Sequence, residues 1–61
     1  MKIGELKKAL KENGCYILRE GSNHEIWFSP KTSQQFPVGR HDSKEINPKT
    51  LHSIQKAAGL K

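Results

Sequence analysis

The chain has 61 residues, of which 33% are hydrophobic, and 11 Lys and Arg against 6 Asp and Glu give it a formal net charge of +5. A chain of this length folds as one domain with a thin core, because it buries only about 60% of the surface that its unfolded form exposes. This size excludes a deep catalytic cleft, so we expect any chemistry on an open face. The charge favours a polyanionic partner such as RNA, DNA or an anionic membrane surface.

The cellular compartment is predicted from the single cysteine and from the absence of targeting signals. Cys15 cannot form an intramolecular disulfide, which fits a reducing cytoplasm, and we expect it to be a small buried apolar residue. The N-terminal stretch MKIGELKKALKE is charged throughout and does not resemble a signal peptide. No apolar run approaches the length of a membrane span. We therefore expect a cytoplasmic protein without a membrane partner.

The first predicted element is a helix over residues 3–13. Ile3, Leu6 and Leu10 recur at three- and four-residue steps and form one apolar stripe. Gly14 can adopt the left-handed conformation that ends a helix. The start is weakly capped, because neither Lys2 nor Ile3 is a good N-cap residue.

Three strands are predicted next, over residues 15–20, 24–29 and 36–38. The first two are rich in β-forming residues and flank a turn over residues 20–23. Pro30 ends the second strand, and Pro37 places the third at a sheet edge, since proline cannot donate to a ladder.

The last helix has the clearest boundaries. Asn47 is a good N-cap, and Pro48 fits the first helical position. Ile46 and Leu51 stand at the two positions of a hydrophobic staple, and Gly59 ends the helix. The predicted fold is a single α+β domain over residues 1–61, in the α-β-β-β-α order of double-stranded-RNA-binding-like domains. Two helices pack on a three-stranded antiparallel sheet.

The predicted hairpin places a histidine beside a turn. With Gly21 and Ser22 at the turn centre, Arg19 stands opposite His24. The same register places Ile17 opposite Ile26 and Cys15 opposite Phe28 on one side, and Tyr16, Leu18, Glu25 and Trp27 on the other. Both sides carry apolar residues, so the pattern does not settle which side the helices cover.

This register has a chemical consequence for the histidine. A guanidinium beside an imidazole favours the neutral ring, which can act as a general base. Arg19 can hold a phosphate. RNA cleavage by the neighbouring 2′-hydroxyl needs such a base and positive charge near the phosphate oxygens. The alternative is that His24 is only a tolerated polar residue next to a turn.

Three segments resemble one protein family. GSNH at 21–24, FPVGRH at 36–41 and KTLHSIQKAAGL at 49–60, with NG at 13–14 after the first helix, resemble the HicA toxins of bacterial HicA–HicB toxin–antitoxin pairs. The resemblance covers essentially the whole chain. It implies a double-stranded-RNA-binding-like fold and a ribosome-independent mRNA endonuclease. It also implies a HicB-like antitoxin that covers the catalytic histidine.

The resemblance assigns site residues one by one. The catalytic histidine of the family falls on His24, and Gly21 and Ser22 match the residues that shape its motif. His41 matches a frequent position that we expect to face the substrate. Apart from the resemblance, the basic residues Arg19 and Arg40 are also expected to contact the RNA. The chain departs from many relatives at Cys15, where they carry an aromatic residue, and at the first helix, which lacks their serine or threonine cap.

Several alternatives stay open from the sequence. The histidines at 24, 41 and 52 are spaced by 17 and 11 residues, which matches no zinc pattern, so we expect no metal or cofactor. We expect His52 to face solvent. Tyr16 and Trp27 could stack on bases or contact an antitoxin, but in a small domain we expect them to pack in the core. The second acid or base could be His41, Arg19, a lysine or water.

Two functions compete with that of an endonuclease. One is a non-catalytic RNA-binding module of the same fold, and the other is an interaction protein whose basic face docks an acidic partner. Seven basic residues could line an RNA path, although a solvated surface charge is the simpler interpretation of each: Lys7, Lys8, Lys11, Arg19, Lys31, Arg40 and Lys44.

Overall fold

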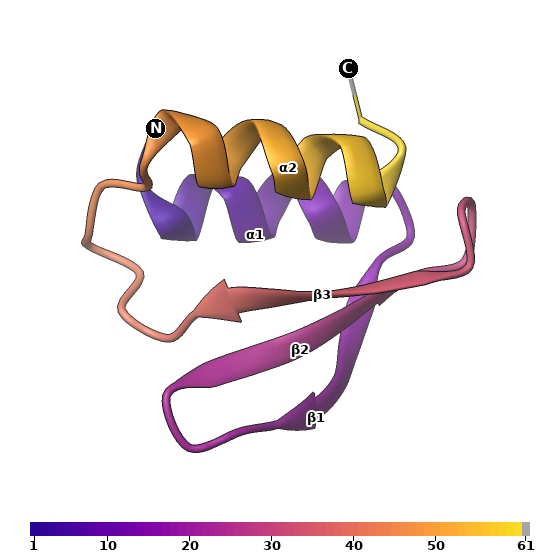
Figure 1. Cartoon of the computed structure of the whole chain (residues 1–61), viewed down its shortest axis with the longest axis horizontal. Helices are drawn as coiled ribbons and strands as arrows, with labels where there is room; N and C mark the ends of the chain where they lie inside the picture. The colour runs from indigo at the N-terminus through magenta and orange to yellow at the C-terminus, as the bar shows by residue number, and fades with distance from the viewer. Residues whose placement is uncertain (61) are drawn as a thin grey trace.

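The computed structural model describes residues 1–60 and contains two helices and one sheet (Figure 1). The elements are α1 (Ile3–Glu12), β1 (Tyr16–Glu20), β2 (His24–Ser29), β3 (Gln34–Gly39) and α2 (Pro48–Ala58). The sheet is antiparallel with strand order β1-β2-β3, and both helices lie on the same side of it. The predicted α+β class and the α-β-β-β-α order are confirmed. No helix within residues 1–60 is long and apolar enough to cross a membrane.

Helix α1 ends at Glu12, one residue before its predicted end, and its start is completed by a distant loop. Gly14 has a φ of 87°, the left-handed conformation that follows a helix end. At the start, Lys2 provides no side-chain cap. Instead, the Ile3 N–H donates to the carbonyl of Lys44 and the Gly4 N–H donates to that of Asp42, each at 2.9 Å. The loop before α2 thus supplies acceptors that the local sequence lacks.

Helix α2 follows its local sequence signals. The Asn47 side chain accepts a hydrogen bond of 2.8 Å from a backbone N–H in the first turn. The helix begins at Pro48 and ends before Gly59, as predicted. Ile46 and Leu51 are both partly buried against the core, consistent with the predicted staple.

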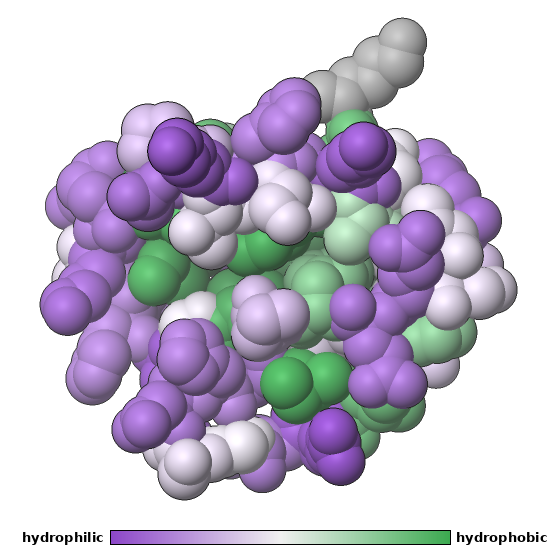
Figure 2. Space-filling model, in the orientation of Figure 1, coloured by the Kyte–Doolittle hydropathy of each residue, from purple (hydrophilic) through white to green (hydrophobic). Residues whose placement is uncertain are grey.

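The core lies between the helices and one face of the sheet. Trp27 is fully buried on this face, and its neighbour Ser29 donates a hydrogen bond of 2.9 Å from Oγ to the carbonyl of Ala58 in α2. Cys15 is buried, as predicted. Figure 2 shows hydrophobic residues gathered between α2 and the sheet, with hydrophilic residues around them. The helices therefore cover the side of β2 that carries Trp27, which the sequence pattern had left open. The buried apolar residues are Ile3, Leu6, Leu10, Cys15, Trp27, Phe36, Val38, Ile54 and Ala58.

The predicted register between the first two strands is wrong. Arg19 stands opposite Ile26 rather than His24, and Glu20 stands opposite Glu25. The connection is longer than a two-residue turn, which moves the partners of Arg19 and Glu20 along β2. An irregularity between Ile17 and Arg19 then inserts an extra residue into β1 and shifts the pairs beyond it.

The shift changes the partners of the remaining β1 residues. Tyr16 stands opposite Phe28, and Ile17 stands opposite Trp27. Cys15 precedes the strand, so its predicted pairing with Phe28 is also wrong. Tyr16 is 48% exposed, so the prediction that it packs in the core is wrong, whereas the same prediction for Trp27 is confirmed.

Candidate active site

His24 lies at the start of β2, directly after the β1–β2 turn, and stands opposite Gly39 of β3. Side chains alternate between the two faces of a strand. Since Trp27 faces the helices, Glu25 shares its side, and His24 belongs to the other side. We call this side, which no helix covers, the outer face of the sheet. His24 is exposed there, as expected for a domain too small for a cleft.

The turn before His24 is closed by tight backbone contacts. The Gly21 N–H donates to the His24 carbonyl at 2.7 Å. A Cβ atom on Gly21 would lie 3.0 Å from that oxygen, so a larger residue would require the turn to shift by a few tenths of an ångström. Glycine therefore allows this close backbone approach.

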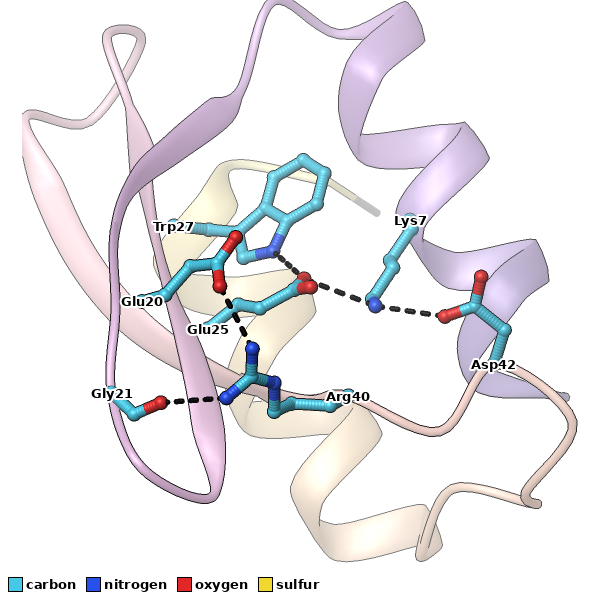
Figure 3. Close-up of polar contacts among 7 residues, drawn as sticks. All are labelled: Lys7, Glu20, Gly21, Glu25, Trp27, Arg40 and Asp42. Atoms are coloured by element: carbon cyan, nitrogen blue, oxygen red, sulfur yellow. Dashed lines mark hydrogen bonds and ion pairs between the residues drawn. The ribbon is translucent and has the colours of Figure 1, made fainter.

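Arg40, which directly follows β3, forms hydrogen bonds with the backbone of the turn (Figure 3). Its guanidinium donates to the carbonyl of Gly21 at 3.0 Å and to that of Ser22 at 3.3 Å. Its other terminal nitrogen forms an ion pair of 2.8 Å with Glu20. This planar fork fixes the turn against the end of β3. The structure thus directs the donors of Arg40 at the turn and at Glu20.

The structure brings together four of the six predicted site residues: Gly21, Ser22, His24 and Arg40. Arg19 shares the outer face but stands opposite Ile26. Arg19 therefore does not stand beside the His24 imidazole, where the predicted register had placed it. His41 follows Arg40 and is exposed. In residues 1–60, no hydrogen bond or ion pair joins its ring to His24.

A second polar cluster lies on the helix-facing side, next to His24 in the chain (Figure 3). Lys7 of α1 places its Nζ 3.0 Å from Glu25 Oε1 and 2.8 Å from Asp42 Oδ1. The Trp27 indole N–H donates to the same Glu25 oxygen at 3.1 Å. We call these residues the Lys7 cluster. It connects β2, at the residue after His24, to α1 and to the loop before α2.

The charges of the Lys7 cluster are stabilised by one another. The Lys7 and Glu25 side chains are only 12% and 15% exposed, so burial opposes both charges. Contacts with Asp42 and Glu25 outweigh that penalty and raise the pKa of Lys7 above its ordinary value. Burial also acts to raise the pKa of Glu25, but the hydrogen bonds from Lys7 and Trp27 prevail, and the pKa of this carboxyl is lowered. Both groups are therefore charged at neutral pH.

Sequence reasoning placed Lys7 among possible RNA contacts and missed this cluster. The correction follows from burial, because a lysine that is mostly covered and bound to two carboxylates has no free charge for a phosphate. The sequence contains one indication of this cluster: Glu25 and Trp27 are two residues apart in a strand and therefore share one face. Once Trp27 is assigned to the core, the carboxylate beside it needs a cationic partner.

The surface around His24 is open. Two hollows of about 250 and 370 Å³ lie between β3 and α2 and along α2, and His24 lines neither. No group of three or more His, Cys, Asp or Glu side chains that could hold a metal ion occurs in the described part of the chain. His52 is exposed on α2, as predicted.

A family model described as the HicA toxin of bacterial toxin–antitoxin systems matches residues 3–60. The chain belongs to the HicA toxin family. It is therefore the toxin of a toxin–antitoxin system, a role that implies an antitoxin partner. Searches of curated proteins and of solved structures gave no match to this HicA-family toxin.

Proposed function

We propose that this HicA-family toxin is an mRNA endonuclease that uses His24 as its general base or acid, without a metal, and that a HicB-like antitoxin inhibits it. The observation that carries the proposal is the position of His24, exposed on an open face beside a turn that Gly21 and Arg40 hold in place. Family membership supports a toxin, and the net charge of +5 favours a polyanionic substrate. We place this activity in the cytoplasm, where mRNA is found.

The proposed reaction is transfer of the phosphoryl group to the neighbouring 2′-oxygen. His24 removes the proton of the 2′-hydroxyl as this oxygen bonds to phosphorus. The bond from phosphorus to the 5′-oxygen breaks, which leaves a 2′,3′-cyclic phosphate and a 5′-hydroxyl. A second group protonates the leaving oxygen, and the candidates are Arg19, His41, a lysine and water. Positive charge near the phosphate stabilises the transition state.

The backbone contacts of the turn before His24 support this role. A general base acts only within hydrogen-bonding distance of the proton that it removes. Hydrogen bonds from the Gly21 N–H and from the Arg40 guanidinium hold the backbone of the turn before His24. The Lys7 cluster holds Glu25, the residue directly after His24. The imidazole therefore projects from backbone that is held on both sides.

The test compares His24→Ala with His52→Ala, a matched control because both histidines are exposed. Each purified variant is incubated with RNA, with and without a chelator, and its fold is checked by the fluorescence of the single tryptophan. We expect His24→Ala to lose RNA cleavage and growth inhibition while it stays folded, and His52→Ala to retain both. Undiminished cleavage by His24→Ala would refute the assignment, and cleavage that stops on adding the chelator would refute the metal-free mechanism.

Two further results would separate this proposal from its alternatives. RNA binding that weakens with salt but yields no cleavage products would indicate a non-catalytic RNA-binding module. A reading frame for a HicB-like antitoxin directly beside the gene would support the proposed partner.

A further inference from the structure

The outer face of the sheet has an unusual composition for a surface that no helix covers. The ladder pairs place Tyr16 and Arg19 of β1, His24, Ile26 and Phe28 of β2, and Pro37 of β3 on this face. None of the paired positions on it is acidic. The two acidic residues of the sheet, Glu20 and Glu25, stand opposite each other on the helix-facing side. The outer face thus combines apolar and aromatic groups with positive charge.

Two aromatic rings meet on the outer face, away from the core. Tyr16 is 48% exposed and Phe28 is partly exposed, and their ring centroids are 5.6 Å apart at an interplanar angle of 49°. A domain with so little core would gain stability by burying these rings. Their exposure therefore indicates a binding surface.

We propose that the outer face binds single-stranded RNA, with unpaired bases stacked on Tyr16 and Phe28 and a phosphate held by Arg19. This inference rests on the proposed function and specifies its substrate as single-stranded. Sheet faces with exposed aromatic rings stack unpaired RNA bases. The faces of paired bases inside a duplex are covered by their neighbours, so a duplex cannot use these rings.

The geometry connects the rings to His24. His24 and Phe28 lie on the same face of β2, four residues apart, which is about 13 Å along a strand. Arg19 stands opposite Ile26, between these two positions. A short single strand that stacks on the rings therefore passes Arg19 and reaches the imidazole.

Arg19 is available for this contact, in contrast to two other basic residues near the site. Lys7 and Arg40 are paired with carboxylates. Within residues 1–60, no ion pair involves Arg19, and it is exposed. A free guanidinium on a face without carboxylates favours a polyanion over an apolar protein surface.

The test measures binding by fluorescence anisotropy of a labelled, unstructured single-stranded RNA and of the same sequence as a duplex. His24→Ala serves as the parent, so that the RNA is not cut. Base stacking on one ring contributes about 1–3 kcal/mol, so Tyr16→Leu and Phe28→Leu should each weaken single-strand binding by about 5- to 150-fold. Tyr16→Phe keeps the ring and should bind as the parent does. Neither leucine variant should change duplex binding.

Arg19→Ala provides an independent variant that removes no ring. It should weaken binding and reduce the slope of log affinity against log salt by about 0.7, the value for one phosphate contact on a single strand. Urea unfolding followed by Trp27 fluorescence checks that each variant is folded.

The outcomes separate this inference from the proposed function. If the wild-type toxin cleaves RNA but both leucine variants bind single-stranded RNA as tightly as the parent, the inference is wrong and the endonuclease stands. If the wild-type toxin does not cleave RNA and the parent binds none, both fail. If the leucine variants keep RNA binding but lose binding to the purified antitoxin, the outer face is an antitoxin surface and the inference is overturned.

Discussion

Replacing Lys7 by methionine should destabilise the fold far more than its position on a basic helix suggests. The change keeps most of the aliphatic stem but leaves the Glu25 carboxylate, 15% exposed, without its cation. Breaking a fully buried pair costs about 3–5 kcal/mol, whereas an exposed pair contributes at most about 1 kcal/mol. Glu25 keeps its hydrogen bond from Trp27. We therefore expect a loss of about 2 kcal/mol in the free energy of unfolding, between these limits.

This loss would be a large fraction of the total stability. At roughly 0.05–0.15 kcal/mol per residue, a chain of this length has an unfolding free energy of about 3–9 kcal/mol. With a urea m-value of about 1 kcal/mol/M for a small domain, the unfolding midpoint should fall by about 2 M. Trp27 reports the transition without a label, because it is the single tryptophan and is fully buried.

A double-mutant cycle assigns the loss to the pair with Glu25. In the Lys7→Met/Glu25→Gln variant no uncompensated carboxylate remains beside Trp27. It should therefore be more stable than Lys7→Met alone by about 1 kcal/mol. Asp42→Asn should cost less than about 1 kcal/mol, because the Asp42 side chain is 67% exposed.

Lys8→Met is the matched control, because Lys8 is the exposed neighbour on the same helix. Its unfolding free energy should change by no more than about 0.5 kcal/mol. The reasoning is refuted if Lys7→Met and Lys8→Met unfold at the same urea concentration. It is also refuted if Lys7→Met costs as much in the presence of Glu25→Gln as in its absence.

Three further predictions concern Glu25, Gly14 and Arg40. The lowered pKa of Glu25 means that its contribution to stability is present above its ordinary pKa of 4.5 and is lost as the pH falls through the lower folded value. The stability difference between wild type and Glu25→Gln, measured by urea unfolding, should therefore stay constant down to about pH 4.5 and shrink as the pH falls from there to the lower folded value; a difference that persists in stronger acid would contradict this. Gly14→Ala should lower the free energy of unfolding by about 1–2 kcal/mol because of the φ of 87° alone, since a Cβ atom there meets nothing within 4 Å. An unchanged thermal unfolding temperature would contradict this prediction. Arg40→Ala should reduce RNA cleavage but change the unfolding free energy by less than about 1 kcal/mol. Arg40→Lys should recover only part of the cleavage activity. If Arg40→Ala cleaves RNA as the wild type does, Arg40 does not position His24.

Elements whose signals lie within a few residues could be predicted from the sequence. Asn47 before Pro48 and Gly59 at the far end fix both ends of α2, because caps act on the nearest turn of the backbone. The position of His24 at the start of a strand after a glycine turn was predicted for the same reason. The family resemblance, which the comparison with the HicA model confirmed, also follows from short segments in a fixed order.

Only the tertiary structure decided the register of β1 against β2, the face of the sheet that the helices cover, and the ion-pair partners of the charged residues. Both faces of the hairpin carry apolar residues, so alternation could not choose between them, and a connection longer than a two-residue turn moved Arg19 away from His24. Packing of α1 and α2 on the Trp27 side brought Lys7 to Glu25 and left Tyr16 and Phe28 uncovered. These features depend on residues far apart in the chain, whose contacts are fixed by how the core is filled rather than by local backbone preference.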